Sequence, residues 1–417
     1  MSKPEIETRA FGYILTWAEE QIQAKVGLIR LHTAGNVTAE VEFSTTNEQW
    51  DSGFLHRSHL NLSSTQSMKS TAKFLTSRYD KELLSEEAWG AIIEQLCYQT
   101  INLTRIGEEA HEVFAVGDPE PPPAYIVDPV IQEGQANLLF GEKQAGKTQS
   151  AMLICAICGL PWYDNPFQFG VPDKQIVSLW LDWETDRSSF AYLYNQLQLG
   201  MGVLLPAIHY RHCRSSLPND IEQIAHWKEK TKAELVVVDH IGLAAGGPLN
   251  DDVTATTYFN AVRQLKTTTL HLAHQSKNPE TKRKTTFGSA FWENIPRTVW
   301  ELKKLAEAED SLDTVMTLTK RNIGKKVPPF GLRYTYNGVG TKVERFEPND
   351  VAEYVQETSA SNRIFLYLQK NGAATSTVIL NELGIPKDTV YKTLKRMMDR
   401  AILVKVGQNY GLVSNRA

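Results

Sequence analysis

Gly141-Glu142-Lys143-Gln144-Ala145-Gly146-Lys147-Thr148 is the stretch of this sequence that decides the fold. Two glycines separated by four residues and followed by Lys and Thr form the pattern of a phosphate-binding loop. Residues 136–140 before it predict a buried strand, and residues 149–159 after it predict a helix. A strand, a glycine-rich bend and a helix direct backbone N–H groups at one point, where they bind anions. Because both flanks are in place, a chance match in an ordinary turn is the weaker interpretation.

The residue types in this loop predict a nucleotide site with ATP and Mg²⁺ as cofactors. Lys147 is expected to contact the β- and γ-phosphates, and the hydroxyl of Thr148 is expected to ligate Mg²⁺. The other positions expected to bind the nucleotide are Gly141, Glu142, Lys143, Gln144, Ala145, Gly146 and Gln149.

Composition limits the class of protein. A chain of 417 residues with 42% apolar residues suggests two or three globular domains. The net charge of −4 means that any contact with nucleic acid must come from local basic patches. The four cysteines are too few for a disulfide scaffold, and Cys155 and Cys158 fall in the predicted helix, where buried core thiols are expected. No apolar run suits a signal peptide or a bilayer span, so a cytoplasmic protein without membrane contact is expected.

The chain divides into three predicted domains. Residues 1–117 form an N-terminal α+β domain of unknown role, and the proline-rich residues 118–126 predict a stiff, extended linker. Residues 127–347 alternate strand and helix patterns, which is typical of an α/β fold with a mainly parallel sheet. Residues 358–417 form a third, basic unit.

Three elements are predicted within the N-terminal domain. Residues 11–23 are expected to be helical, and residues 27–43 are expected to form a hairpin that turns at Gly35-Asn36. Residues 86–104 predict an amphipathic helix. This domain contains no evident catalytic constellation.

Carboxylates end two of the predicted strands of the α/β domain. Residues 176–184 read as a buried strand that places Asp182 and Glu184 on one face, and Glu184 at the tip is the expected catalytic base. Residues 235–239 predict a central strand that presents Asp239 to Mg²⁺. The alternative for the first pair is a solvated strand end.

Polar residues end two further strands. Gln275 ends a strand over residues 270–275 and could sense the γ-phosphate. Lys320 and Arg321 end a strand over residues 317–321 and could reach the phosphates of a neighbouring subunit. On charge alone, a solvated strand end is an equal alternative for these two cations.

Residues 127–347 together resemble the RecA-like ATPases and, within them, the RepA-type replicative helicases of plasmids and phages. The resemblance rests on Leu138-Leu139-Phe140-Gly141, Leu181-Asp182-Trp183-Glu184 and His274-Gln275. It implies a RecA-like core, Gln275 at the sensor position and Lys320 as a lysine that acts on the neighbouring subunit. It also implies a homo-oligomer, which could be a hexameric ring.

A basic segment follows the predicted sensor strand. Its cations are Lys277, Lys282, Arg283 and Lys284. A flexible basic loop at this edge of the sheet could follow the phosphates of single-stranded DNA without reading its sequence. The alternative is a solvated surface loop.

The C-terminal unit is similar to winged-helix DNA-binding domains. Helices are predicted over residues 363–370, 375–384 and 386–400, and residues 402–413 predict the wing. Residues 361–417 hold nine basic and three acidic side chains. The cations expected to contact duplex DNA are Lys387, Lys392, Lys395 and Arg396. The alternative is a winged helix that binds protein.

These patterns predict an ATP-dependent DNA-binding ATPase, most simply a RepA-like helicase in replication or recombination of a plasmid, phage or integrated element. One alternative is a helicase-loading factor that hydrolyses ATP and does not unwind DNA. Another is a DNA-binding regulator that uses ATP as a switch. Unwinding of a forked duplex separates the first interpretation from both alternatives.

Overall fold

The computed structural model describes residues 2–9, 11–32, 35–47, 50, 53–80, 82–107, 110, 112, 124–276, 285–323, 327–348, 360–399 and 402–413. Its contacts group the chain into two compact units. The first comprises Met1–Pro122, Ser215–Lys232 and Thr256–Lys266, and the second comprises Pro123–Arg214, Ala233–Ala255 and Thr267–Ala417. None of the helices in the described ranges is long and apolar enough to cross a membrane.

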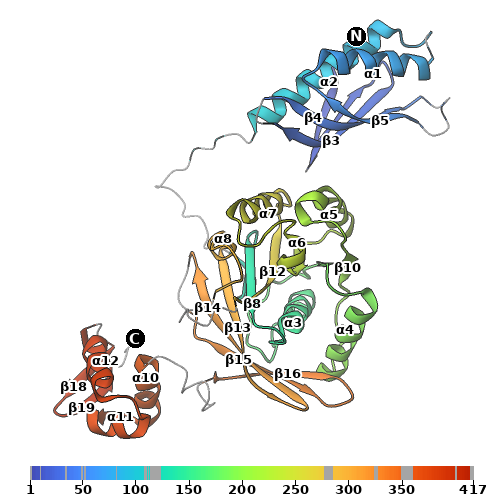
Figure 1. Cartoon of the computed structure of the whole chain (residues 1–417). Coiled ribbons are helices and arrows are strands. Elements are labelled where there is room, and N and C mark those ends of the chain that lie inside the picture. Colours follow the sequence, from blue (N-terminus) through green and yellow to red (C-terminus); the bar gives the residue numbers. More distant parts are fainter. Residues whose placement is uncertain are drawn as a thin grey trace. The chain divides into compact units, whose positions relative to one another are not determined.

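The N-terminal part of the first unit is an antiparallel sheet with two helices on one face (Figure 1). The strands follow each other in sequence order: β1 (Glu5–Arg9), β2 (Gly12–Trp17), β3 (Ile22–Leu31), β4 (Val37–Thr45) and β5 (Phe54–Asn61). The helices are α1 (Thr65–Arg78) and α2 (Glu86–Ile106). The first unit also contains α5 (Leu217–Thr231) and most of α7 (Asp252–Gln264).

Helix α2 confirms the amphipathic helix predicted over residues 86–104. The Ser85 side chain caps its first turn by accepting a hydrogen bond from the backbone N–H of Ala88. Trp89, Ile93 and Leu96 recur on one face and are fully buried in the core of this domain. The predicted hairpin is also present, because β3 pairs antiparallel with β4, the next strand of the chain.

The helix predicted over residues 11–23 is wrong. This segment forms β2, a turn and the start of β3. Leu15 and Trp17 are both fully buried, two positions apart, which is the period of a strand with one face in the core. The apolar residues of this short segment fit either period, and pairing with β1 and β3 decided between them.

The second unit is built on one sheet of nine strands. Its order is β10-β9-β11-β12-β8-β13-β14-β15-β16, with parallel pairs from β10 to β13 and antiparallel pairs from β13 to β16. The parallel strands are β8 (Ala136–Gly141), β9 (Ser178–Asp182), β10 (His209–His212), β11 (Leu235–Asp239), β12 (Thr268–His274) and β13 (Thr298–Ala308). The others are β14 (Ser311–Arg321), β15 (Phe330–Tyr336) and β16 (Thr341–Phe346). The mainly parallel sheet predicted from the sequence is confirmed.

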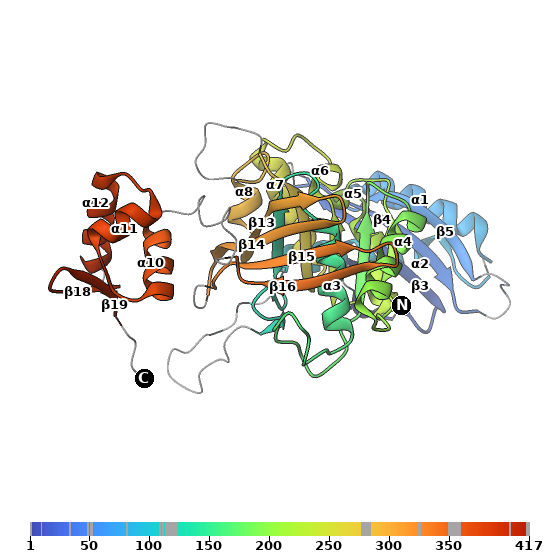
Figure 2. The same ribbon diagram turned by 90° about the horizontal axis from the view of Figure 1, so that it is seen from below.

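Helices α3 (Lys147–Gly159) and α4 (Arg187–Met201) lie on one side of this sheet, and Figure 2 shows the antiparallel strands running side by side. The short helix α6 (Ile241–Ala244) follows β11, and the short helix α8 (Phe291–Asn294) precedes β13. A small hairpin of β6 (Tyr125–Val127) and β7 (Ile131–Gln132) precedes β8.

Helix α3 is buried along nearly its whole length. Cys155 and Cys158 are buried free thiols within it, as expected for core residues, and burial raises the pKa of Cys155 to about 12. The hydroxyls of Ser150 and Tyr334 are hydrogen-bonded at 2.6 Å, which ties α3 to the antiparallel strand β15.

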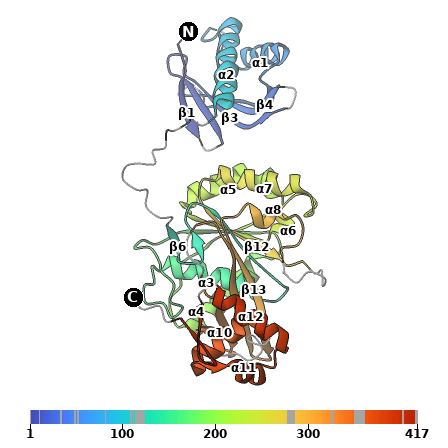
Figure 3. The same cartoon turned by 90° about the vertical axis from the view of Figure 1, so that its left-hand side faces the viewer.

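The C-terminal residues form a small three-helix unit with its own core (Figure 3). Its elements are α10 (Ala360–Asn371), β17 (Ala374–Thr375), α11 (Ser376–Leu383), α12 (Lys387–Asp399), β18 (Leu403–Val406) and β19 (Asn409–Leu412). Thr375 caps α11, which ends at Gly384 with a φ of 57°. Val390, Leu394 and Met397 are buried and form the apolar stripe of α12.

Candidate nucleotide-binding site

The phosphate loop joins the end of β8 to the start of α3. A Cβ at Gly141 would lie 2.2 Å from the carbonyl oxygen of Leu302 on β13, so only glycine fits where these two strands pair. Gly146 has a φ of 81°, in the left-handed region that disfavours other residues. Both glycines of the motif are therefore required by the backbone path.

The first turn of α3 has no side-chain cap and contains no acidic residue. The first N–H groups of a helix have no partner within the helix and carry the positive end of its dipole. An anion placed here satisfies them, which is how such loops bind phosphate.

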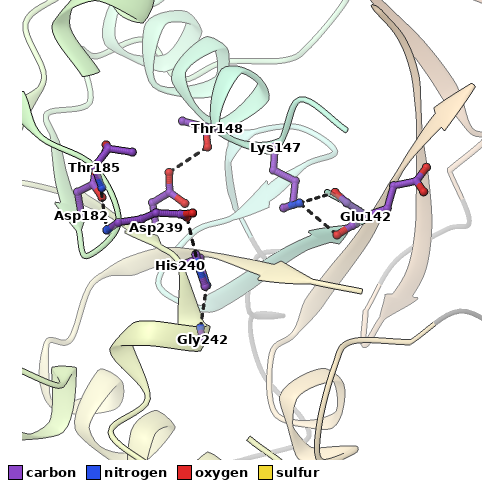
Figure 4. A network of polar contacts seen from close by, with 10 residues as sticks. Glu142, Lys147, Thr148, Asp182, Thr185, Asp239, His240 and Gly242 are labelled. Atoms are coloured by element: carbon purple, nitrogen blue, oxygen red, sulfur yellow. Dashed lines mark hydrogen bonds and ion pairs between the residues drawn. The ribbon is translucent and has the colours of Figure 1, made fainter. Parts of the chain in front are cut away.

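Lys147 is buried at the start of α3 (Figure 4). Its Nζ donates hydrogen bonds to the carbonyl oxygens of Gly141 at 3.1 Å and Glu142 at 2.6 Å. Burial lowers the pKa of Lys147, although Asp239 and Glu184 act in the opposite direction. The loop thus holds its cation in place, and phosphate oxygens can replace the two carbonyls as acceptors.

Asp239 meets the phosphate loop from the end of β11. The Thr148 hydroxyl donates a hydrogen bond to Oδ2 of Asp239 at 3.0 Å. Burial, together with the nearby carboxylates of Asp182 and Glu184, raises the pKa of Asp239 to about 7. A buried carboxylate beside a hydroxyl supplies hard oxygen ligands, so this pair fits a divalent cation such as Mg²⁺.

Asp239→Asn is expected to stabilise the protein at alkaline pH in the absence of Mg²⁺. Because the folded-state pKa of Asp239 is raised, its stabilising contribution is complete below about pH 4 and is lost as the pH rises through about 7. The asparagine variant should therefore be more stable at pH 8.5 by on the order of 2–4 kcal/mol. Thermal unfolding with EDTA, from pH 5 to pH 8.5, measures this.

The difference in stability between Asp239→Asn and the wild type should become smaller toward pH 5, where the folded wild-type protein has a protonated Asp239 carboxyl. Asp310→Asn is the matched control, since Asp310 is exposed in the β13–β14 turn. A stability difference of the same size at every pH would contradict the raised pKa of the buried Asp239 carboxyl.

Asp182 stabilises the turn after β9 through hydrogen bonds to its carboxylate. Its Oδ1 accepts from the backbone N–H groups of Glu184 at 2.8 Å and Thr185 at 2.9 Å. Its Oδ2 accepts from the hydroxyls of Thr185 at 2.5 Å and Tyr210 at 3.2 Å. With both oxygens occupied, this buried carboxylate fixes the backbone that carries Glu184.

Glu184 lies beyond the end of β9, so the prediction that it shares a strand face with Asp182 is wrong. The chain turns at Asp182 because that carboxylate captures the next N–H groups. The Glu184 side chain is 55% exposed and lines the same cavity as Lys147, with Oε2 lying 3.3 Å from Nε2 of His240.

His274 lines this cavity from the end of β12, next to the predicted sensor Gln275. Its ring lies 4.6 Å from the His240 ring, and its Nδ1 is buried without a hydrogen-bond partner within the described part of the chain. Burial, with the charges of Lys147 and other neighbours, lowers the pKa of His274 to about 4, so the ring is neutral at pH 7.

Strand alternation could have identified His274 from the sequence. Leu270 and Leu272 pack in the core that contains α3, and His274 continues their face of β12. Gln275 falls one position out of phase and is not among the residues that line the cavity within the described ranges. Its backbone N–H donates to the carbonyl of Gly141.

The cavity at the phosphate loop has a volume of about 600 Å³. Its lining also includes Leu193, Leu312 and Tyr336. The Tyr336 hydroxyl donates to Oε1 of Gln149 at 3.1 Å, which holds the ring beside the loop. No motif marks these residues, because they come from a helix and from the antiparallel strands.

Lys320 and Arg321, predicted to act on a neighbouring subunit, have partners within the chain. Nζ of Lys320 donates to three carbonyls at the end of α8, where the helix dipole favours a cation. The acceptors are Glu293 at 3.1 Å, Asn294 at 2.5 Å and Pro296 at 2.7 Å. The Arg321 guanidinium lies 4.7 Å from the ring centre of Tyr125. Both cations thus stabilise their own domain in a single chain.

The residues predicted to contact DNA fall into two groups. Lys277, Lys282, Arg283 and Lys284 lie outside the described residues. The cations of α12 are all exposed, and most of them lie away from its buried stripe: Lys387, Lys392, Lys395 and Arg396.

Residues 107–280 match the family model of an AAA domain. The match includes the phosphate loop, Glu184, Asp239 and β12, and indicates a nucleotide-binding domain of the P-loop ATPase kind. No curated protein matches the chain.

Proposed function

We propose that this protein is an ATP-dependent DNA-binding ATPase, a RepA-like helicase acting in replication or recombination of a plasmid, phage or integrated element. The observation that carries the ATPase part is the meeting of three groups in one cavity. The uncapped start of α3, the Thr148–Asp239 pair and the Glu184 carboxylate all line it.

Each group has a chemical task in hydrolysis of ATP. The backbone N–H groups of the loop and Lys147 bind the phosphates and stabilise negative charge. Thr148 and Asp239 would hold Mg²⁺, which neutralises phosphate charge when bound. Glu184 accepts the proton of the attacking water, and His274 or Gln275 senses the γ-phosphate. Leu312 and Tyr336 offer an apolar and aromatic wall against which the adenine ring of ATP can pack.

The DNA-binding part of the proposal divides two tasks between two regions. The basic segment of residues 277–284 binds single strands through their phosphates, coupled to ATP. The C-terminal unit acts as a winged helix, and its exposed α12 cations bind duplex DNA. A ring of subunits, such as a hexamer, would bring several copies of the basic segment together around one DNA strand.

Single-stranded DNA is expected to raise the rate of ATP hydrolysis by on the order of tenfold, the size of a typical coupling between two sites. Neutralising Lys282, Arg283 and Lys284 should abolish this stimulation. Neutralising Lys392, Lys395 and Arg396 should preserve it and lower the salt dependence of duplex binding by up to about three phosphate contacts. The measurements are phosphate release and duplex binding at several salt concentrations.

Lys370→Gln is the matched control, because Lys370 is an exposed cation of α10 in the same unit. Loss of single-strand stimulation in the α12 variant, together with its retention in the loop variant, would reverse the assignment. An ATPase rate that does not change with single-stranded or duplex DNA would contradict the DNA-dependent part of the proposed function.

One observation favours a second candidate, a loading factor or ATP-switched regulator that does not unwind DNA. Lys320 and Arg321 are engaged within their own domain. A ring helicase needs a cation that reaches the neighbouring site, so these contacts favour a protein whose subunits hydrolyse ATP independently. Unwinding of a forked duplex, with particle size measured in the presence of ATP, separates the two candidates.

A further inference from the structure

His240 follows the metal-site carboxylate Asp239 and begins α6. Its side chain is 12% exposed, and its Nδ1 accepts a hydrogen bond from the backbone N–H of Gly242 at 2.9 Å. A Cβ at Gly242 would lie 2.6 Å from Cε1 of His240, so ring and backbone are in close contact. The ring of His274 packs against that of His240, edge to face, at 4.6 Å between ring centres. His240 is therefore held in one orientation.

Its opposite nitrogen faces the expected base. Nε2 of His240 lies 3.3 Å from Oε2 of Glu184. The Glu184 side chain is 55% exposed, so this long carboxylate would otherwise sample several rotamers. A fixed neighbour within reach is what such a side chain needs in order to stay in one place.

The hydrogen bond at Nδ1 determines where the ring carries its proton. A neutral imidazole has one N–H, and a nitrogen that accepts a hydrogen bond cannot carry it. Nδ1 accepts from Gly242, so the proton resides on Nε2, toward the Glu184 carboxylate.

The same tautomer argues against a metal ion at this cluster. Glu184, His240 and His274 have potential ligand atoms within 4.8 Å of one another. A metal ligand needs a free lone pair, and Nε2 of His240 carries the proton whereas Nδ1 is occupied by Gly242. The arrangement suits a hydrogen-bond donor.

We propose that His240 is the positioning residue of the hydrolytic site. Its Nε2–H donates to the Glu184 carboxylate and holds it in the direction from which it can accept the proton of the attacking water. His240 keeps its own proton throughout and does not touch the substrate. This inference rests on the proposed role of Glu184 as the base.

Two substitutions separate the two nitrogens of the ring. In His240→Asn, the amide oxygen can take the place of Nδ1 and accept from Gly242, but no donor reaches Glu184. In His240→Gln, the longer amide can supply an N–H near the position of Nε2. The asparagine variant should lower kcat by about 10- to 100-fold, with KM and ATP affinity unchanged, because the base is misplaced. The glutamine variant should recover most of that loss.

Gly242→Ala tests the inference without changing the histidine. Its methyl group must push the His240 ring, so kcat should fall in the wild-type background and not fall further in His240→Asn. Steady-state kinetics and ATP binding are measured for each variant, and unchanged ATP affinity shows that the site is folded.

Three results would overturn the inference. They are a wild-type kcat in His240→Asn, equal losses in the asparagine and glutamine variants, and an additional loss when His240→Asn is combined with Glu184→Gln. The proposed function fails in a different way: Glu184→Gln alone would then hydrolyse ATP at the wild-type rate.

Discussion

Glu184→Gln is expected to lower kcat for ATP hydrolysis by about 10²- to 10⁴-fold while ATP affinity stays within about threefold of the wild type. The amide keeps the size of the side chain and cannot accept a proton from water. The exposed carboxylate makes little contact that the fold depends on, so the thermal unfolding midpoint should hardly change. Phosphate release and equilibrium binding of a fluorescent ATP analogue measure the two effects.

Glu309→Gln is the matched control, because Glu309 is another exposed carboxylate that lines the same cavity. It should hydrolyse ATP at the wild-type rate. Full activity in Glu184→Gln would exclude Glu184 as the base. Asp182 would be a poor replacement, because both of its oxygens already accept hydrogen bonds from the turn and from Tyr210.

Lys147→Met is expected to weaken ATP binding by about 30- to 1000-fold, the cost of truncating one partner of a buried charge pair. Methionine retains much of the volume of the lysine and removes the cation that the loop holds for the phosphates. Equilibrium binding of ATP and of adenosine measures the effect. The loss should be large for ATP and small for adenosine, which has no phosphate.

Lys143→Met is its control, since Lys143 is an exposed cation of the same loop and lines the same cavity. Its ATP affinity should stay within about fivefold of the wild type, as for an exposed charge. If Lys147→Met binds ATP as tightly as the wild type, the loop does not bind phosphate through this residue.

Sequence reasoning worked where one local pattern determines both backbone and chemistry. The glycines at 141 and 146 are demanded by a close strand contact and by a left-handed turn, so the motif specifies its own geometry. Asp239 could be predicted because acids at the carboxyl ends of parallel strands lie at the same edge of the sheet as the phosphate loop, here with only β12 between β11 and β8.

It failed where distant segments decide the outcome. No motif marks His240, whose orientation depends on His274 of another strand as well as on the nearby Gly242. Tyr336 reaches the cavity from an antiparallel strand far along the chain. Lys320 binds three carbonyls at the end of α8, and the pattern of charges in the sequence does not reveal this contact. Residues 11–23 fit two periods, and only sheet pairing chose between them.

The link between α3 and β15 defines how much of the chain a nucleotide-binding fragment must contain. Ser150 and Gln149, in the first turns of α3, are hydrogen-bonded to Tyr334 and Tyr336. The recognisable AAA segment stops at residue 280, ahead of both tyrosines. A fragment cut there would retain the phosphate loop, Glu184 and Asp239, and would lose the scaffold that supports the helix behind them. The minimal fragment therefore extends through β16, to Phe346.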